Sequence, residues 1–272
     1  MKFFHALFIA VIALAFPLTS IEAQPESKEM EEPTDAPAEE QANSGGNSAT
    51  REGVQAAKAG NWDKAIESFK RAGSSDASRY NLALAYRQRG QAEVKKENWD
   101  GAISDFNEAL KLKENDAVAL RFRGFAYLRK GSWKEAVEDY NTVLKAKKND
   151  GEALGRRAFV YMQLRDYDKA LTDYSAILKD QPKDINALLG RSYVYELTNK
   201  PDKGLIDVDA VLKIKPGNED ALNRKKRLDA INNKLHPTPI PTPVLAGTPI
   251  PRASLPPKPK PSPKTSPTPS PH

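Results

Sequence analysis

The 272-residue chain contains no cysteine, and its three histidines stand at positions 5, 236 and 272. A chain without cysteine has no disulfide, no thiolate nucleophile and no cysteine-ligated zinc site. Histidine, the commonest general base and metal ligand, is missing from residues 6–235. The sequence also lacks a glycine-rich phosphate loop and a His-Glu-x-x-His pair. We therefore expect no catalytic residue, no metal site and no cofactor.

The first 23 residues have the pattern of an export signal. Lys2 precedes an apolar stretch over residues 3–16, and Ala23 ends a small-residue cleavage pattern. These 14 residues are fewer than the roughly 20 that a membrane-spanning helix needs. No Asn-x-Ser/Thr acceptor occurs, which favours a bacterial envelope. We predict a cleaved signal peptide, no transmembrane span after cleavage, and a periplasmic or secreted bacterial protein; an uncleaved anchor is the competing interpretation.

Two further segments are poor in large apolar side chains. Residues 24–49 carry seven acidic side chains and one lysine, so we expect a disordered acidic leader. In residues 236–272, 14 of 37 positions are proline and the four formal charges are positive. Such a composition predicts a disordered, basic tail of extended polyproline.

A short motif recurs between these tails. It joins an aromatic residue to an alanine three positions later, and its copies begin at Trp62, Trp99, Trp133 and Tyr167, with a weaker copy at Pro201. Each of the last three steps is 34 residues, which is the period of a stacked helix-turn-helix unit. Arrays of this kind usually provide binding surface.

Each unit contains two amphipathic helices. In the third copy, Leu120, Gly124 and Tyr127 follow spacings of four and three, which places them on one stripe of a helix. A break at Gly131 follows, and Trp133 opens a second helix with its own apolar stripe.

On these residues the chain resembles the tetratricopeptide repeat family, over about residues 50–235. The resemblance implies an all-α fold: a right-handed α-solenoid of about five helix-turn-helix repeats plus a C-terminal capping helix, flanked by disordered tails. We place the repeats and the capping helix at residues 50–75, 76–116, 117–150, 151–184, 185–218 and 219–235.

Two units depart from the period. The step from Ala65 to Ala102 is 37 residues, and we predict seven residues inserted between Gly90 and Trp99, which would lengthen the first helix of the second unit by about two turns. In the fifth unit Gly204 replaces the motif's alanine. Because glycine inside a helix costs roughly 1 kcal/mol relative to alanine, we predict that this unit is the least stable.

Two charged rows keep the 34-residue period. Arg123, Arg157 and Arg191 stand on the first helices, and Asp105, Asp139, Asp173 and Asp207 stand on the second helices. The arginines are either a basic strip for acidic ligands or partners of the aspartates where helices meet. We favour the second interpretation because both rows keep strict register.

The resemblance implies that the first helices line a concave groove that holds peptides. Phe125, Phe159 and Tyr193 form an aromatic ladder with the same period. The ladder either lines this groove, where aromatic side chains dominate binding, or packs between first helices as core. Our candidate groove residues are Arg121, Phe125, Leu128, Arg129, Phe159, Met162 and Tyr193.

We predict a non-catalytic protein–protein interaction module or scaffold with a protein or peptide partner. The alternative is a structural envelope component whose repeats act as a spacer and whose basic tail contacts an anionic wall or membrane surface. The excess of lysine and arginine is spread over all helices, whereas nucleic-acid binding usually concentrates it on one face. We therefore expect no nucleic-acid partner.

Overall fold

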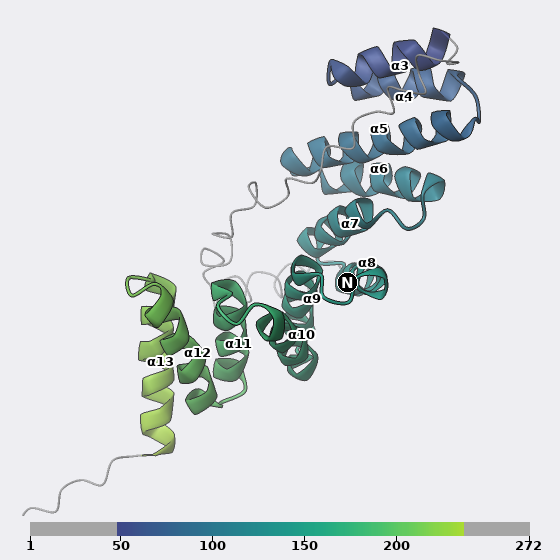
Figure 1. Cartoon of the computed structure of the whole chain (residues 1–272). Coiled ribbons are helices and arrows are strands. Elements are labelled where there is room, and N and C mark those ends of the chain that lie inside the picture. The colour runs from purple at the N-terminus through teal and green to yellow at the C-terminus, as the bar shows by residue number, and fades with distance from the viewer. Residues whose placement is uncertain (1–47, 237–272) are drawn as a thin grey trace, which may run out of the picture. The chain divides into compact units, whose positions relative to one another are not determined.

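The computed structural model describes residues 48–236, which form eleven α-helices without a strand in that range (Figure 1). The helices are α3 (Ser48–Lys58), α4 (Trp62–Arg71), α5 (Asp76–Lys95), α6 (Trp99–Leu112), α7 (Ala117–Lys130), α8 (Trp133–Ala146), α9 (Gly151–Gln163), α10 (Tyr167–Asp180), α11 (Ile185–Leu197), α12 (Pro201–Ile214) and α13 (Glu219–Leu235). The predicted signal peptide, nearly all of the acidic leader and the proline-rich tail after residue 236 lie outside the described residues. Residues 48 and 49, which we placed in the leader, open α3.

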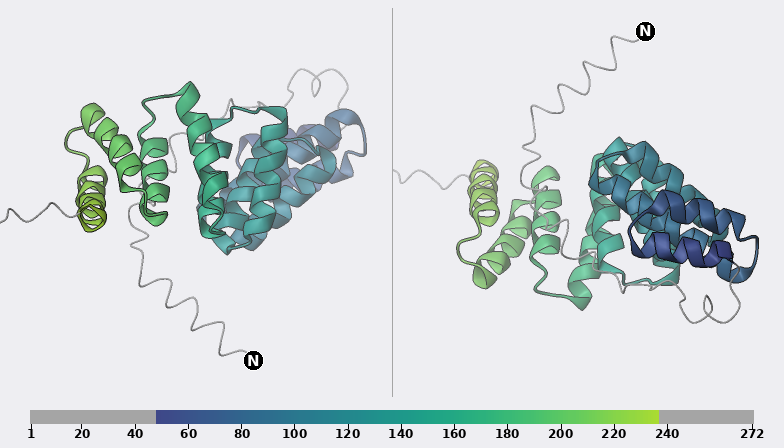
Figure 2. Two further views of the ribbon diagram at one scale, coloured as in Figure 1. Left: turned by 90° about the horizontal axis from the view of Figure 1, so that it is seen from below. Right: turned by 90° about the horizontal axis from the view of Figure 1, so that it is seen from above.

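Helices that follow one another in the chain pack side by side. Helices α3 to α12 form five antiparallel-type pairs, and each pair also contacts the next one, while α13 covers α12 (Figures 1 and 2). This arrangement of repeated helix pairs confirms the predicted all-α solenoid with a C-terminal capping helix. Odd-numbered helices up to α11 are called first helices below, and their partners second helices.

Aspartates start three of the first helices. Side-chain oxygens of Asp116, Asp150 and Asp184 accept hydrogen bonds from backbone N–H groups of α7, α9 and α11 at 3.0, 3.0 and 2.7 Å. Such caps satisfy donors that have no partner within the helix, and a negative charge suits the helix N-terminus. The α7–α8 turn uses Gly131, whose φ of 78° is the left-handed conformation that favours glycine.

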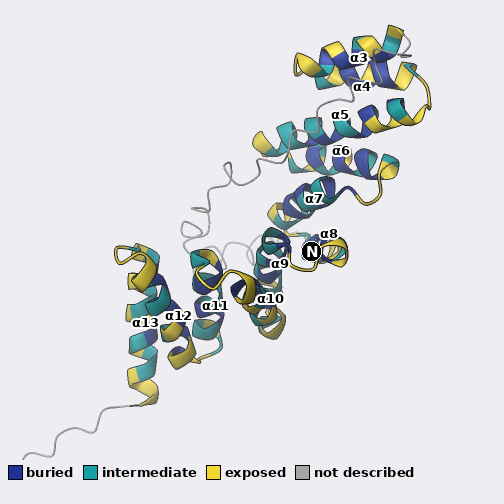
Figure 3. Cartoon of the chain, in the orientation of Figure 1, coloured by how far each residue is buried: buried dark blue, intermediate teal, exposed yellow. Residues whose placement is uncertain are grey.

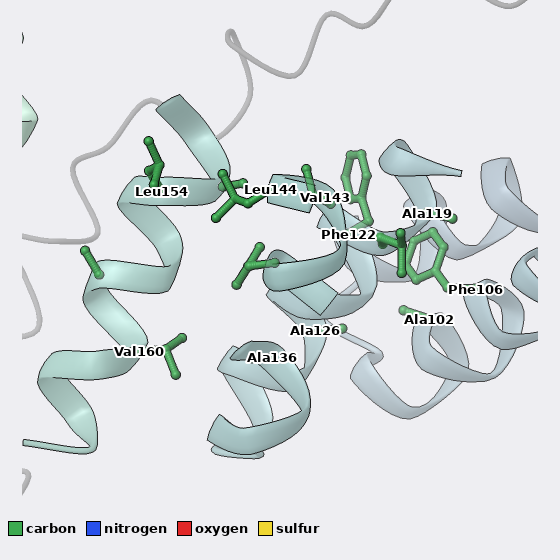
Figure 4. Packing of buried hydrophobic residues seen from close by; sticks show 14 of the residues in the cluster. Ala102, Phe106, Ala119, Phe122, Ala126, Ala136, Val143, Leu144, Leu154 and Val160 are labelled. Atoms are coloured by element: carbon green, nitrogen blue, oxygen red, sulfur yellow. The ribbon is translucent and has the colours of Figure 1, made fainter. Parts of the chain in front are cut away.

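An aromatic ring on each of the first three second helices packs against a glycine of its own first helix. A Cβ atom added to Gly90 would lie 2.8 Å from the Phe106 ring, and one added to Gly124 would lie 3.0 Å from Tyr140. The missing side chain therefore lets the two helices approach closely. The rings join a core that runs through all the units (Figure 3), and Figure 4 shows part of this core from close by.

The first helix of the second unit is longer, as predicted: α5 has 20 residues and α7 has 14. The position of the insertion was predicted wrongly. Gly90 packs on Phe106 as Gly124 packs on Tyr140, and nine positions separate each glycine from the next tryptophan, so nothing is inserted there. The extra turns lie at the start of α5, because α4 ends early at Arg71.

The fifth unit keeps a regular second helix despite its unusual residues. Pro201 occupies the first turn of α12, where its missing N–H removes no helical hydrogen bond. A Cβ atom at Gly204 would lie 3.0 Å from the methyl groups of Leu228 on α13. Gly204 thus gives the capping helix room to pack; the lower stability of this unit remains a prediction.

Candidate peptide-binding face

The arginine row holds the repeats together. Arg157 on α9 donates from Nε and Nη2 to both oxygens of Asp173 on α10, at 2.9 and 2.6 Å. Its Nη1 donates to Asn141 on α8 of the preceding unit at 2.6 Å. Arg123 and Arg191 repeat this geometry with Asp139 and Asp207. This confirms the structural interpretation of the two rows.

The Arg–Asp pairs are poorly accessible to a ligand. The Asp173 side chain is only 4% exposed and that of Arg157 is 19% exposed. Burial raises the pKa of the Asp173 carboxyl, and the hydrogen bond from Arg157 opposes this shift. A bidentate pair at a buried position serves to fix the geometry of the helices that it joins.

A second set of arginines, which sequence reasoning missed, joins first helices of successive units. Arg87 donates to the α7 cap residue Asp116 at 3.0 Å, and Arg121 donates to the α9 cap residue Asp150 at 3.2 Å. The signal was a 29-residue Arg-to-Asp spacing that occurs twice, 34 residues apart. Arg121, a candidate groove residue, also lies 3.6 Å from Glu152, and its side chain is 13% exposed.

The aromatic ladder is divided between core and surface. Phe125 is 8% exposed, meets Trp99 edge to face with ring centroids 5.9 Å apart, and has the Arg156 guanidinium 4.6 Å from its ring. Phe125 therefore packs between the second, third and fourth units. Phe159 is half-buried and stands outside the cluster of core residues.

Tyr193 is also half-buried, beside the capping helix. The Arg224 guanidinium of α13 lies 4.6 Å from its ring, and partial burial raises the pKa of its hydroxyl to about 12. Arg224 and Arg227 both bind Glu196 of α11, at 2.8 and 2.6 Å. The last rung of the ladder thus lies next to the contact that holds α13.

The remaining candidates differ in accessibility. Leu128 is half-buried against the core, and Arg129 is exposed, with its guanidinium 5.0 Å from the Trp99 ring. We expected Met162 to add accessible apolar surface, but it is 6% exposed and its sulfur accepts a hydrogen bond from the Tyr174 hydroxyl at 3.6 Å. Met162 therefore serves the core. The assignment of the other candidates to a binding groove remains a prediction.

Residues 48–236 contain no group of three or more His, Cys, Asp or Glu side chains placed to hold a metal ion. No helix in the same range is long and apolar enough to cross a membrane.

Comparison with known proteins agrees with the architecture. Two family models described as tetratricopeptide repeat match residues 87–151 and 127–192. A tetratricopeptide repeat protein from Parabacteroides merdae superposes with a TM-score of 0.56 at 22% identity, covering 68% of this chain and 73% of that chain. YrrB, described as a TPR protein with an unusual peptide-binding site, superposes with a TM-score of 0.54 at 19% identity. The match covers 69% of this chain and 95% of YrrB.

A search of the curated proteins found no match. The repeat motifs, the packing of successive helix pairs and the two family models agree with one another. Residues 87–192 therefore match tetratricopeptide repeats, and the helix pairs of residues 48–236 have the fold of such repeats.

Proposed function

We propose that this protein is a non-catalytic interaction module or scaffold of the bacterial periplasm or cell envelope, and that it binds a peptide or protein partner along its first helices. The match of residues 87–192 to tetratricopeptide repeats, which offer surface and not chemistry, supports the proposal. YrrB, which shares the fold, is described as having a peptide-binding site. The envelope location rests on the export pattern of residues 1–23.

One observation carries the choice of surface. Phe159 is half-buried on α9 and is not part of the core cluster, although its position carries an aromatic residue in three successive units. The Arg–Asp pair that joins the two helices of its unit does not involve it. A repeated aromatic side chain that is not part of the core is suited to contact a binding partner, because aromatic residues supply much of the affinity at interfaces.

Site-specific photo-crosslinking in intact cells tests this proposal. A photoreactive amino acid replaces Gln163 on α9, or Thr172 on the second helix α10 as the matched control; both positions are exposed. We expect a specific crosslinked partner from position 163 and none from position 172. The reverse result would reject the first-helix surface. Loss of the protein from the envelope fraction after deletion of residues 237–272 would favour the spacer alternative.

A further inference from the structure

The contact between the first and second units differs from the contact between the second and third. We call these the first seam (α3–α4 against α5–α6) and the second seam (α5–α6 against α7–α8). At the second seam, Phe122 of α7 stacks on Phe106 with ring centroids 5.9 Å apart, and Phe125 meets Trp99. The residues 34 positions before these phenylalanines are Gln88 and Gln91 on α5. The first seam therefore lacks two of the rings that fill the second.

This substitution leaves an apolar hollow of about 90 Å³ at the first seam. Trp62 and Phe69 of α4 form one wall, and Asn81, Leu84 and Gln88 of α5 form another. Gln88 corresponds in position to Phe122, so a glutamine and Phe69 line this hollow where the second seam has two stacked phenylalanines.

Asn81 is the polar group of this hollow that needs an explanation. It is 2% exposed, and its Oδ1 is buried and accepts no hydrogen bond from any described residue. A buried acceptor without a donor destabilises a fold, and such groups are rare in native proteins unless a water or a ligand satisfies them. The extra turns at the start of α5 carry this asparagine, and none of α7, α9 and α11 has an equivalent of them.

A larger recess at the same seam has a different character. It has a volume of about 640 Å³ and is lined by charged side chains that include Asp63, Arg89, Glu93, Lys96 and Asp105. Arg89 binds both Asp63 and Asp105, and Lys96 binds Glu93. Because these charges already satisfy one another, the apolar hollow is the better candidate for a ligand.

We infer that the hollow receives one branched aliphatic side chain of a bound peptide, and that Asn81 Oδ1 accepts a hydrogen bond from a backbone N–H of that peptide. This inference rests on the proposed function. An apolar cavity of about 150 Å³ holds a benzene ring, so a hollow of about 90 Å³ suits valine, leucine or isoleucine better than an aromatic residue. The orphaned acceptor requires a donor, which every peptide residue except proline supplies.

Panning a random heptapeptide library on the full chain provides the probes. We expect selected peptides to share one aliphatic position and to bind the Gln88→Phe variant at least tenfold more weakly, because the new ring would take the space of the glutamine side chain together with the hollow, as Phe122 does at the second seam. Gln181→Phe, an exposed Gln-to-Phe change outside the hollow, should leave affinity unchanged. Leu84→Phe, which also fills the hollow, replaces Gln88→Phe if the latter fails to fold.

The hydrogen bond has its own test. Methylation of the backbone nitrogen at each position of a selected peptide should weaken binding several-fold at one position in the unaltered chain, and this penalty should disappear in Asn81→Ala. A penalty that persists in Asn81→Ala would overturn the assignment of Asn81.

The remaining outcomes separate the two proposals. If the selected peptides bind Gln88→Phe and the unaltered chain equally, the hollow is not used while the interaction module stands. If no peptide is selected, the inference fails, and crosslinking from position 163 decides separately whether the interaction module stands. If peptides bind only after deletion of residues 237–272, the chain's own tail occupies the hollow, and the inference of a partner peptide is overturned.

Discussion

The second and third units each contain the same Arg–Asp ion pair, but the first and second seams, where each of these units meets the one before it, are filled by different side chains. Arg89 binds Asp105 with the bidentate geometry that Arg123 uses for Asp139. Arg123 also reaches Asn107 in the preceding unit, whereas Arg89 reaches Asp63. The difference has a simple cause, because the residue that corresponds to Asn107 in the first unit is Lys70, which is not an acceptor.

This comparison separates two tasks of a repeat. The Arg–Asp pair fixes the angle between helices and recurs in four units, while the apolar filling between units changes from rings at the second seam to glutamines at the first. A repeat array can therefore vary its surface at one seam without losing its architecture. Each prediction below changes a contact within a unit or the packing between units.

The largest effect is expected when an ion pair is broken. Arg157→Ala leaves the buried Asp173 without its bidentate donor, which should lower the free energy of unfolding by about 3 to 5 kcal/mol and the melting temperature by about 10 °C. Arg89→Ala should lower the free energy of unfolding by a similar amount, because the Arg–Asp pair does not depend on the apolar side chains that pack between units. Thermal unfolding followed by circular dichroism measures both. A shift below about a degree for Arg157→Ala would contradict the holding role.

The Arg87–Asp116 contact between successive first helices should contribute less to the free energy of unfolding than the Arg–Asp pair within a unit. Asp116→Ala removes the α7 cap and the acceptor of Arg87, whereas Asp184→Ala removes only the α11 cap among described contacts. We expect losses of about 2 to 3 and about 1 kcal/mol respectively. Chemical denaturation gives the difference, which measures the Arg87 contact together with the second cap hydrogen bond and the Lys113 ion pair of Asp116. Equal losses would show that these contacts add no stability.

Two glycines on neighbouring first helices should respond in opposite directions. A Cβ atom at Gly190 would lie 2.4 Å from Tyr174, so Gly190→Ala should destabilise the fold by about 1 to 3 kcal/mol through overpacking. The nearest atom to a Cβ at Gly155 is 3.7 Å away, and Gly155→Ala should stabilise by up to about 1 kcal/mol through helix propensity. Stabilisation of both variants would contradict the close packing of Gly190 on Tyr174.

The smallest effect on stability is expected from filling the first seam. Gln88→Phe should raise the free energy of unfolding by about 1 kcal/mol, because a buried ring replaces a half-buried amide in the hollow. Differential scanning calorimetry against the unaltered chain is sensitive enough to detect it. Destabilisation by the same amount would mean that the hollow is too small for a ring.

Much of the fold could be predicted from sequence because the residues that determine the helix pairs recur at a fixed spacing. The motif beginning at Trp99 and the Arg157–Asp173 register predicted helix pairs and the contacts between them, and both were confirmed. The extra turns of α5 were misplaced because the step between motifs measures only the length of an insertion. Its position depends on where α4 ends at Arg71, which the period does not specify.

The candidate site was less predictable. Spacing placed Phe125 and Phe159 on the same helical flank, but their burial differs because their neighbours do: Trp99 and Arg156 cover Phe125. Met162 lies in the core for a similar reason, since it meets Tyr174 across the unit. A side chain's exposure is decided by its neighbours in its own unit and in the adjacent one, and the 34-residue register does not specify these neighbours.

The most direct test of the binding face is a nuclear magnetic resonance titration of the full chain with a peptide selected by panning. Our account predicts that the largest amide shifts fall on the first helices α5, α7, α9 and α11, with the strongest on α5 around Asn81 and Gln88. The second helices α8 and α10 should shift little. Shifts confined to second helices, or to residues 237–272, would contradict the proposal that the first helices bind the partner.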